Sequence, residues 1–88
     1  MDYCVYILFS PKYGHYYIGQ TNNLERRLVQ HNESKCGWTK KFRPWSIVYK
    51  KKYHERGKAI KAEKYLKSLK NKKNIEIFVV NYYRGVEE

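Results

Sequence analysis

Residues 14–31 hold the pattern that most constrains the fold, because a strand, a glycine and a helix start follow one another directly. The aromatic and β-branched residues at 16–18 favour a strand, since such side chains pack well on a pleated surface. Gly19 interrupts that run at a point where a bend or a close backbone approach is easiest for glycine. We therefore expect a short strand that leads straight into a helix.

A helix is predicted over about residues 23–32. Asn22 and, three residues later, Glu25 form a pair that resembles a capping box, so the helix should begin near Asn22 or the next residue. Four side chains at helical spacing share the face expected to pack against the domain, and these are Leu24, Arg27, Leu28 and His31.

Arg27 is unusual on a core-facing stripe, because a guanidinium is rarely buried unless something pairs it. One interpretation is that the side chain has a functional partner. The other is that it extends to the rim of an ordinary amphipathic helix, as long cationic side chains do. The helix by itself does not distinguish the two.

The remaining elements follow from apolar runs along the chain. Residues 3–9 predict a central strand, and a turn with proline and glycine joins it to residues 15–18 as an antiparallel hairpin. Residues 45–49 predict a third strand that leads into three exposed lysines. Residues 55–70 predict a helix with an apolar stripe, whereas the short run at 75–83 fits a helix or a strand.

The chain has 88 residues, which fits a single small domain, residues 1–88, of the α/β (α+β) class. No apolar run is long enough to span a bilayer, and no signal-peptide pattern is present, so we expect no membrane association. Cys4 and Cys36 do not predict a disulfide framework or a zinc site. The expected location is a reducing cytoplasm.

Basic charge is concentrated in one part of the chain. The formal net charge is +11, and residues 35–73 contain 15 lysines and arginines against two acids. Such an asymmetry favours a phosphate-rich or membrane-surface partner, and we interpret it as nucleic acid rather than as a merely solubilising surface.

The loop over residues 32–44 places cations beside aromatic rings. Its basic residues are Lys35, Lys40, Lys41 and Arg43. Cations next to aromatic residues suit contact with a nucleic-acid backbone. An equally good interpretation is that Trp38 or Phe42 anchors the loop to the core.

Glu63 lies beside the apolar stripe of the helix predicted over residues 55–70, at about 100° per residue. A carboxylate at that position in so basic a helix calls for a partner, such as a bound cation or Arg27. The simpler alternative is an ordinary helical pair with Lys67, four residues later.

These residues resemble one family. Residues 4–6 (Cys-Val-Tyr) and 17–19 (Tyr-Ile-Gly) are similar to the paired tripeptides of the GIY-YIG nuclease domain, with the first Gly-Ile replaced by Cys-Val. Arg27, followed four residues later by His31, resembles the helix that carries the family's catalytic arginine. Glu63 matches the family's metal-binding glutamate, and the resemblance is closest to the small stand-alone members.

The resemblance implies a three-stranded antiparallel sheet flanked by helices, the GIY-YIG endonuclease fold. It also implies a metal-dependent endonuclease that hydrolyses phosphodiester bonds with one Mg²⁺ or Mn²⁺. DNA is the expected substrate, in repair or processing, with non-specific or structure-directed cutting. The alternatives are a non-catalytic nucleic-acid-binding module with the same fold, and a domain that acts only within a protein complex.

The resemblance assigns roles to five residues. Arg27 would stabilise the transition state, and Glu63 would hold the metal ion. Tyr6 would position or deprotonate the attacking water, and Tyr17 would orient phosphate or water. His31, with an ordinary pKa near neutral pH, would assist in proton transfer.

Three further points come from the same resemblance. Thr21 and Lys41 are candidates to touch the phosphate. Cys4, where the family has glycine, would either narrow the site or fill a gap in the core. Asn81 is the candidate counterpart of an asparagine that some members carry near the C-terminus.

Overall fold

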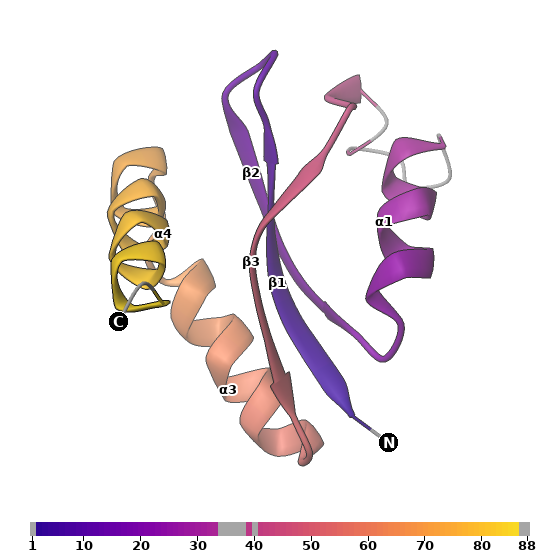
Figure 1. The fold of residues 1–88 in the computed structure, drawn as a ribbon, viewed down its shortest axis with the longest axis vertical. Helices are drawn as coiled ribbons and strands as arrows, with labels where there is room; N and C mark the ends of the chain where they lie inside the picture. The colour runs from indigo at the N-terminus through magenta and orange to yellow at the C-terminus, as the bar shows by residue number, and fades with distance from the viewer. Residues whose placement is uncertain (1, 34–38, 40, 87–88) are drawn as a thin grey trace.

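The computed structural model describes residues 2–33, 39 and 41–86. The strands and helices are β1 (Tyr3–Ser10), β2 (His15–Thr21), α1 (Leu24–Asn32), β3 (Ser46–Tyr53), α3 (Arg56–Lys67) and α4 (Lys72–Val86) (Figure 1). Within these residues, none of the helices has the length and apolar character needed to cross a membrane.

The three strands form one antiparallel sheet in the order β2-β1-β3, as predicted. The apolar run of β1 occupies the centre, where it pairs with β2 and β3. β3 is an edge strand and continues through Lys50, Lys51 and Lys52, which the sequence prediction had left outside the strand. Their side chains stay exposed, so the backbone pairs with β1 while the charges remain in water.

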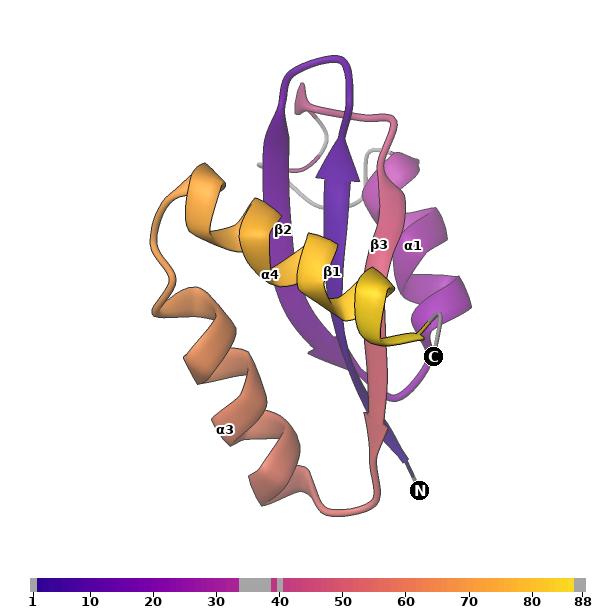
Figure 2. The ribbon, with the colours of Figure 1, turned by 60° about the vertical axis from the view of Figure 1, so that its left-hand side comes forward.

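The sheet lies between helices, with α1 on one face and α3 and α4 on the other (Figures 1 and 2). Because successive side chains of β1 point to opposite faces of the sheet, this strand contributes to the hydrophobic core on both faces. Val5 and Ile7 pack with the buried Ala59 and Leu66 of α3, whereas Tyr6 joins a second cluster. That second cluster lies on the α1 face and contains Leu8, Trp45, Leu24 and Leu28.

The segment that fitted either a helix or a strand is helical, and α4 crosses the sheet on the α3 side (Figure 2). Ile75 and Val79, four residues apart, are buried, and Phe78 packs beside them. Because this spacing matches one face of a helix, the run covers the sheet as a single amphipathic helix.

Candidate active site

The turn between β2 and α1 sets the direction of the site residues on α1. Asn23 is the N-cap, and its side-chain oxygen accepts a hydrogen bond from the Arg26 N–H at 3.1 Å. The predicted pair of Asn22 and Glu25 is therefore wrong by one residue. Thr21 fixes the turn from the strand side, since its hydroxyl oxygen accepts a bond from the Asn23 N–H at 3.1 Å.

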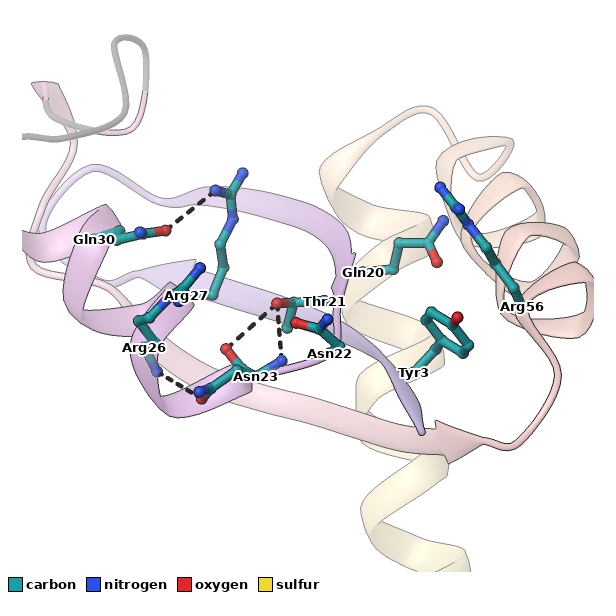
Figure 3. Close-up of a pocket in the computed structure, with 9 residues that line it drawn as sticks. All are labelled: Tyr3, Gln20, Thr21, Asn22, Asn23, Arg26, Arg27, Gln30 and Arg56. Atoms are coloured by element: carbon teal, nitrogen blue, oxygen red, sulfur yellow. Dashed lines mark hydrogen bonds between the residues drawn. The ribbon is translucent and has the colours of Figure 1, made fainter. Parts of the chain in front are cut away.

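A pocket of about 440 Å³ opens at the end of β2, between α1 and the first residue of α3 (Figure 3). It is lined by Tyr3, Gln20, Thr21, Asn22, Asn23, Arg26, Arg27, Gln30 and Arg56. Every charged residue in this lining is an arginine. The pocket is therefore suited to an anion, and the arginine guanidinium binds phosphate and carboxylate groups through two parallel N–H donors.

Arg27 is half-buried on the wall of this pocket, with one guanidinium nitrogen donating to the side-chain oxygen of Gln30 at 3.2 Å. It lies neither in the apolar core nor fully in solvent. Its place on the inward face of α1 is explained by the pocket, which favours the functional interpretation over a simple extension to the rim.

Glu63 reaches the pocket through Gln20. The Gln20 side-chain amide donates to one carboxylate oxygen at 3.1 Å, and Lys67 lies 3.2 Å from the other oxygen. The Glu63 side chain is 18% exposed. Its described partners are thus Gln20 and Lys67. The helical pair with Lys67 confirms the simpler of the two interpretations, and no ion pair with Arg27 is seen among the described residues.

Tyr6 and His31 form a buried pair that is not part of the pocket lining. The Tyr6 hydroxyl lies 3.2 Å from His31 Nε2, and His31 Nδ1 lies 3.0 Å from the Thr39 hydroxyl. Tyr6 and His31 are each 1% exposed. Tyr17 is half-buried, and its ring lies 4.6 Å from the His31 ring between centroids.

The environment of His31 changes the role expected for it. Burial, together with the positive charge of Arg27, lowers the pKa of His31 from 6.5 to about 4. The expectation that its pKa lies near neutral pH is therefore wrong. At pH 7 the ring is neutral, so it links Tyr6 to Thr39 by hydrogen bonds and is a poor proton acceptor.

The burial of Tyr6 also revises an expectation. Because Tyr6 is almost completely buried, it has no contact with bulk water in this conformation. Tyr6 is therefore not placed to touch an attacking water directly. Tyr17 is the more accessible phenol of the two.

The predicted nucleic-acid contacts are not gathered in one place. Thr21 lines the arginine pocket, whereas Lys41 and Arg43 are exposed and are not among its lining residues. Lys35 and Lys40 lie outside the described residues. Phe42 is half-buried and packs its ring against His15, with centroids 4.3 Å apart, so it anchors the loop. Trp38 also lies outside the described residues.

Two smaller expectations can be compared with the structure. Cys4 is 9% exposed and does not line the arginine pocket, so it leaves that site unnarrowed. Asn81 is exposed and lines a separate cavity with Tyr49 and Phe78. It is therefore not brought to Arg27.

Gln20, Thr39 and Arg56 are the site residues that sequence reasoning missed. Alternation along β2 places Gln20 on the same face as the buried Ile18, toward α3, which was a usable signal. Thr39 and Arg56 carried no local signal, because their importance depends on the packing of distant segments.

Gly19 is the residue that lets Tyr6 sit in its place. A Cβ at this position would lie 2.7 Å from the Tyr6 hydroxyl oxygen and 3.1 Å from a ring carbon of Tyr17. We expect Gly19→Ala to lower the free energy of unfolding by about 1–3 kcal/mol, the usual cost of overpacking. Urea unfolding measures this loss.

Gly57→Ala is the matched control, because a Cβ there would meet no heavy atom within 4 Å among the described residues. It lies within α3, where alanine is the better helix former, so its unfolding midpoint should stay or rise. Equal midpoints for the two variants would contradict the role given to Gly19.

Comparison with known proteins agrees with this geometry. A family model described as the GIY-YIG catalytic domain matches residues 2–76. The UPF0213 protein of Bacillus cereus is 32% identical over 75 residues, covering 84% of this chain and 77% of that protein. UPF0213 protein YazA of Bacillus subtilis is 34% identical over 65 residues, covering 73% and 65% respectively.

A fungal protein is also similar over a shorter stretch. The structure-specific endonuclease subunit SLX1 of Phaeosphaeria nodorum is 46% identical over 51 residues, which are 52% of this chain and 14% of that protein. Among solved structures, the UPF0213 protein BH0048 of Bacillus halodurans aligns with a TM-score of 0.56 at 27% identity, covering 91% of this chain and 85% of that one. With the family model matching most of its length, the chain belongs to the GIY-YIG nuclease family.

Proposed function

We propose that this protein is a divalent-metal-dependent endonuclease that hydrolyses phosphodiester bonds of DNA in the cytoplasm. The observation that carries the proposal is the arginine-lined pocket, joined to the carboxylate of Glu63 through Gln20, within a GIY-YIG domain. An anion-binding wall and a nearby carboxylate are the two groups that metal-assisted phosphate chemistry requires.

Arg27 is the residue proposed to stabilise the transition state. When a water oxygen forms its bond to phosphorus, negative charge builds on the non-bridging oxygens while the bond to the leaving sugar oxygen breaks. The attacking water gives its proton to solvent, and the leaving oxygen takes a proton from solvent. A guanidinium held at the pocket wall stabilises that charge without having to reorganise. Its bond to Gln30 restricts the side chain and so contributes to this preorganisation.

Glu63 is the residue proposed to hold Mg²⁺ or Mn²⁺. No cluster of three or more His, Cys, Asp or Glu side chains that could hold a metal occurs in the described part of the chain. One partly exposed carboxylate nevertheless fits Mg²⁺, which is commonly held by one or two carboxylates, waters and substrate phosphate. When bound, the ion would polarise the phosphate and stabilise the leaving oxygen.

The neighbours of Glu63 are compatible with such a ligand. Lys67 is 58% exposed, so its flexible side chain can turn away from the carboxylate into solvent. Gln20 donates to a single oxygen of Glu63, which orients the carboxylate and leaves the other oxygen for a cation.

Tyr17 is proposed to position the attacking water, and the buried pair of Tyr6 and His31 to support the Tyr17 ring from behind by packing against it. A phenol has a pKa near 10 and is a weak base at neutral pH, so positioning is the larger part of its role. Neutral His31 accepts or donates one hydrogen bond with Tyr6 and holds that ring in place. Tyr17, on the same face and less buried, would orient water or phosphate.

Substrate choice is proposed to depend on shape and charge. A domain of this size leaves little surface for reading base edges, and the described basic residues between 41 and 73 are all exposed. The name of the fungal relative, a structure-specific endonuclease subunit, supports structure-directed cutting, and non-specific cutting is the alternative. In both cases binding should weaken steeply as salt rises.

A nicking assay on supercoiled and branched DNA tests the proposal, with Mg²⁺, Mn²⁺ or EDTA in parallel reactions. We expect cleavage with either metal ion and none with EDTA. Binding without cleavage under every condition would favour the non-catalytic module instead.

Glu63→Gln keeps the shape of the side chain and removes its charge. We expect it to lower the cleavage rate at least about 100-fold at low Mg²⁺, because a neutral amide is a weak ligand for this ion. Partial recovery at high Mn²⁺ would identify the lesion as loss of metal affinity.

Glu76→Gln is the matched control, since it makes the same chemical change at an exposed carboxylate on α4. It should cut at the wild-type rate. A Glu63→Gln protein that is folded and fully active would remove Glu63 from the site.

A further inference from the structure

On the side of the pocket opposite α1, α3 contributes one lining residue, Arg56, which has no role in the function proposed so far. Arg56 is the first residue of α3 and lines the same pocket as Arg27 and Arg26. In Figure 3 it stands beside Gln20 and Tyr3, while the two arginines of α1 lie on the other side. The pocket is thus cationic on two walls that come from opposite faces of the sheet.

Arg56 is exposed and forms no ion pair within the described part of the chain. The carboxylate nearest in sequence, Glu55, lies 3.0 Å from the Lys58 ammonium instead. The pocket lining itself contains no acidic side chain. The charge of Arg56 is therefore available to an anion in the pocket.

One phosphate does not account for both walls. Arg27 and Gln30 hold one side of a pocket of about 440 Å³, a volume within the range of small-molecule binding sites. A single phosphate group fills only part of such a space. A nucleic-acid strand, in contrast, carries a charge at every residue and presents several phosphates along one path.

We propose that Arg56 binds a second phosphate of the same strand, next to the one that is cut. This inference rests on the proposed function, because it takes the substrate to be a polynucleotide. The strand then passes between α1 and α3, with Arg27 at the reacting phosphate and Arg56 at a flanking one. Arg56 is a binding residue that sets how much of the strand must be present.

The test measures binding separately from cutting. A fluorescein-labelled single-stranded DNA of about a dozen nucleotides is titrated with protein in EDTA, and anisotropy is recorded over a series of salt concentrations. The variants are Arg56→Gln and the matched control Arg84→Gln, which removes the same charge from an exposed position on α4 that does not line the pocket.

We expect Arg56→Gln to weaken binding about 10-fold and to reduce the slope of log affinity against log salt by about 0.7, the value for one phosphate contact on a single strand. Arg84→Gln should leave that slope unchanged. In steady-state cleavage, Arg56→Gln should raise KM and keep kcat, because its contact is made equally in the ground state and the transition state.

Equal salt slopes for Arg56→Gln and Arg84→Gln would overturn the inference, as would a wild-type protein that does not bind the oligonucleotide. A fall in kcat with unchanged KM would also overturn it, since Arg56 would then act on the reacting phosphate. If wild type binds with the expected difference between variants but never cuts, the phosphate contact stands and the proposed nuclease activity fails.

Discussion

Arg27→Gln is expected to lower the cleavage rate constant about 100- to 1,000-fold, the usual effect of removing one preorganised donor to a developing negative charge. Glutamine keeps part of the side-chain length and loses the charge. Because the contact strengthens as charge builds on the phosphate, the loss should fall on kcat and leave KM nearly unchanged. Single-turnover cleavage of a labelled duplex measures it.

A second readout separates this effect from misfolding. The charge of Arg27 contributes to the low pKa of His31, so its removal should raise that pKa from about 4 toward 6.5, while burial keeps it below that value. NMR titration of the His31 ring reports the shift. A folded Arg27→Gln protein that retains wild-type kcat would remove Arg27 from the catalytic role.

His31 should make the stability of the protein depend on pH in the mildly acidic range. Its pKa is about 4 in the folded state and near 6.5 when unfolded, so the unfolded chain binds the proton first. The contribution of His31 is complete above pH 6.5 and is lost as pH falls toward 4. We expect the free energy of unfolding to drop by about 2 kcal/mol from pH 7 to pH 5.

Urea unfolding at a series of pH values measures this drop, with His31→Gln as the test variant. That variant should be less stable at pH 7 and should lack most of the slope between pH 7 and pH 5. His54→Gln is the control, because His54 is an exposed histidine that pairs with Asp2 at the surface. If His31→Gln and wild type lose stability in parallel, His31 is not the titrating group.

Features that depend on neighbouring residues were predictable from the sequence. The apolar run predicted a central strand at β1, and the helical spacing of apolar residues predicted α3; both elements are confirmed. Gly14 has a φ of 67°, as expected for a glycine that closes the hairpin turn. The start of α1 was predictable only to within a residue, since two adjacent asparagines offer the same capping chemistry.

Features that depend on packing across the sheet were not predictable in the same way. The bond between Gln20 and Glu63 joins residues 43 positions apart, and no local pattern encodes it. The low pKa of His31 results mainly from burial, and the position of His31 on one face of α1 does not show how deeply the ring is buried. Arg56 is one of many basic residues in its half of the chain until α3 is placed beside the end of β2.

Arg27 lies on α1 and Glu63 on α3, so the two residues proposed for catalysis belong to helices on opposite faces of the sheet (Figure 1). Synthesis from the N-terminus produces Tyr17, Arg27 and His31 before Glu63 of α3. The hairpin and α1 by themselves therefore contain the proposed arginine and tyrosine residues of the site but lack the carboxylate of Glu63. If the proposed roles of Arg27 and Glu63 hold, cleavage requires both helix layers, so a chain that lacks α3 should not cut the nucleic acids around it.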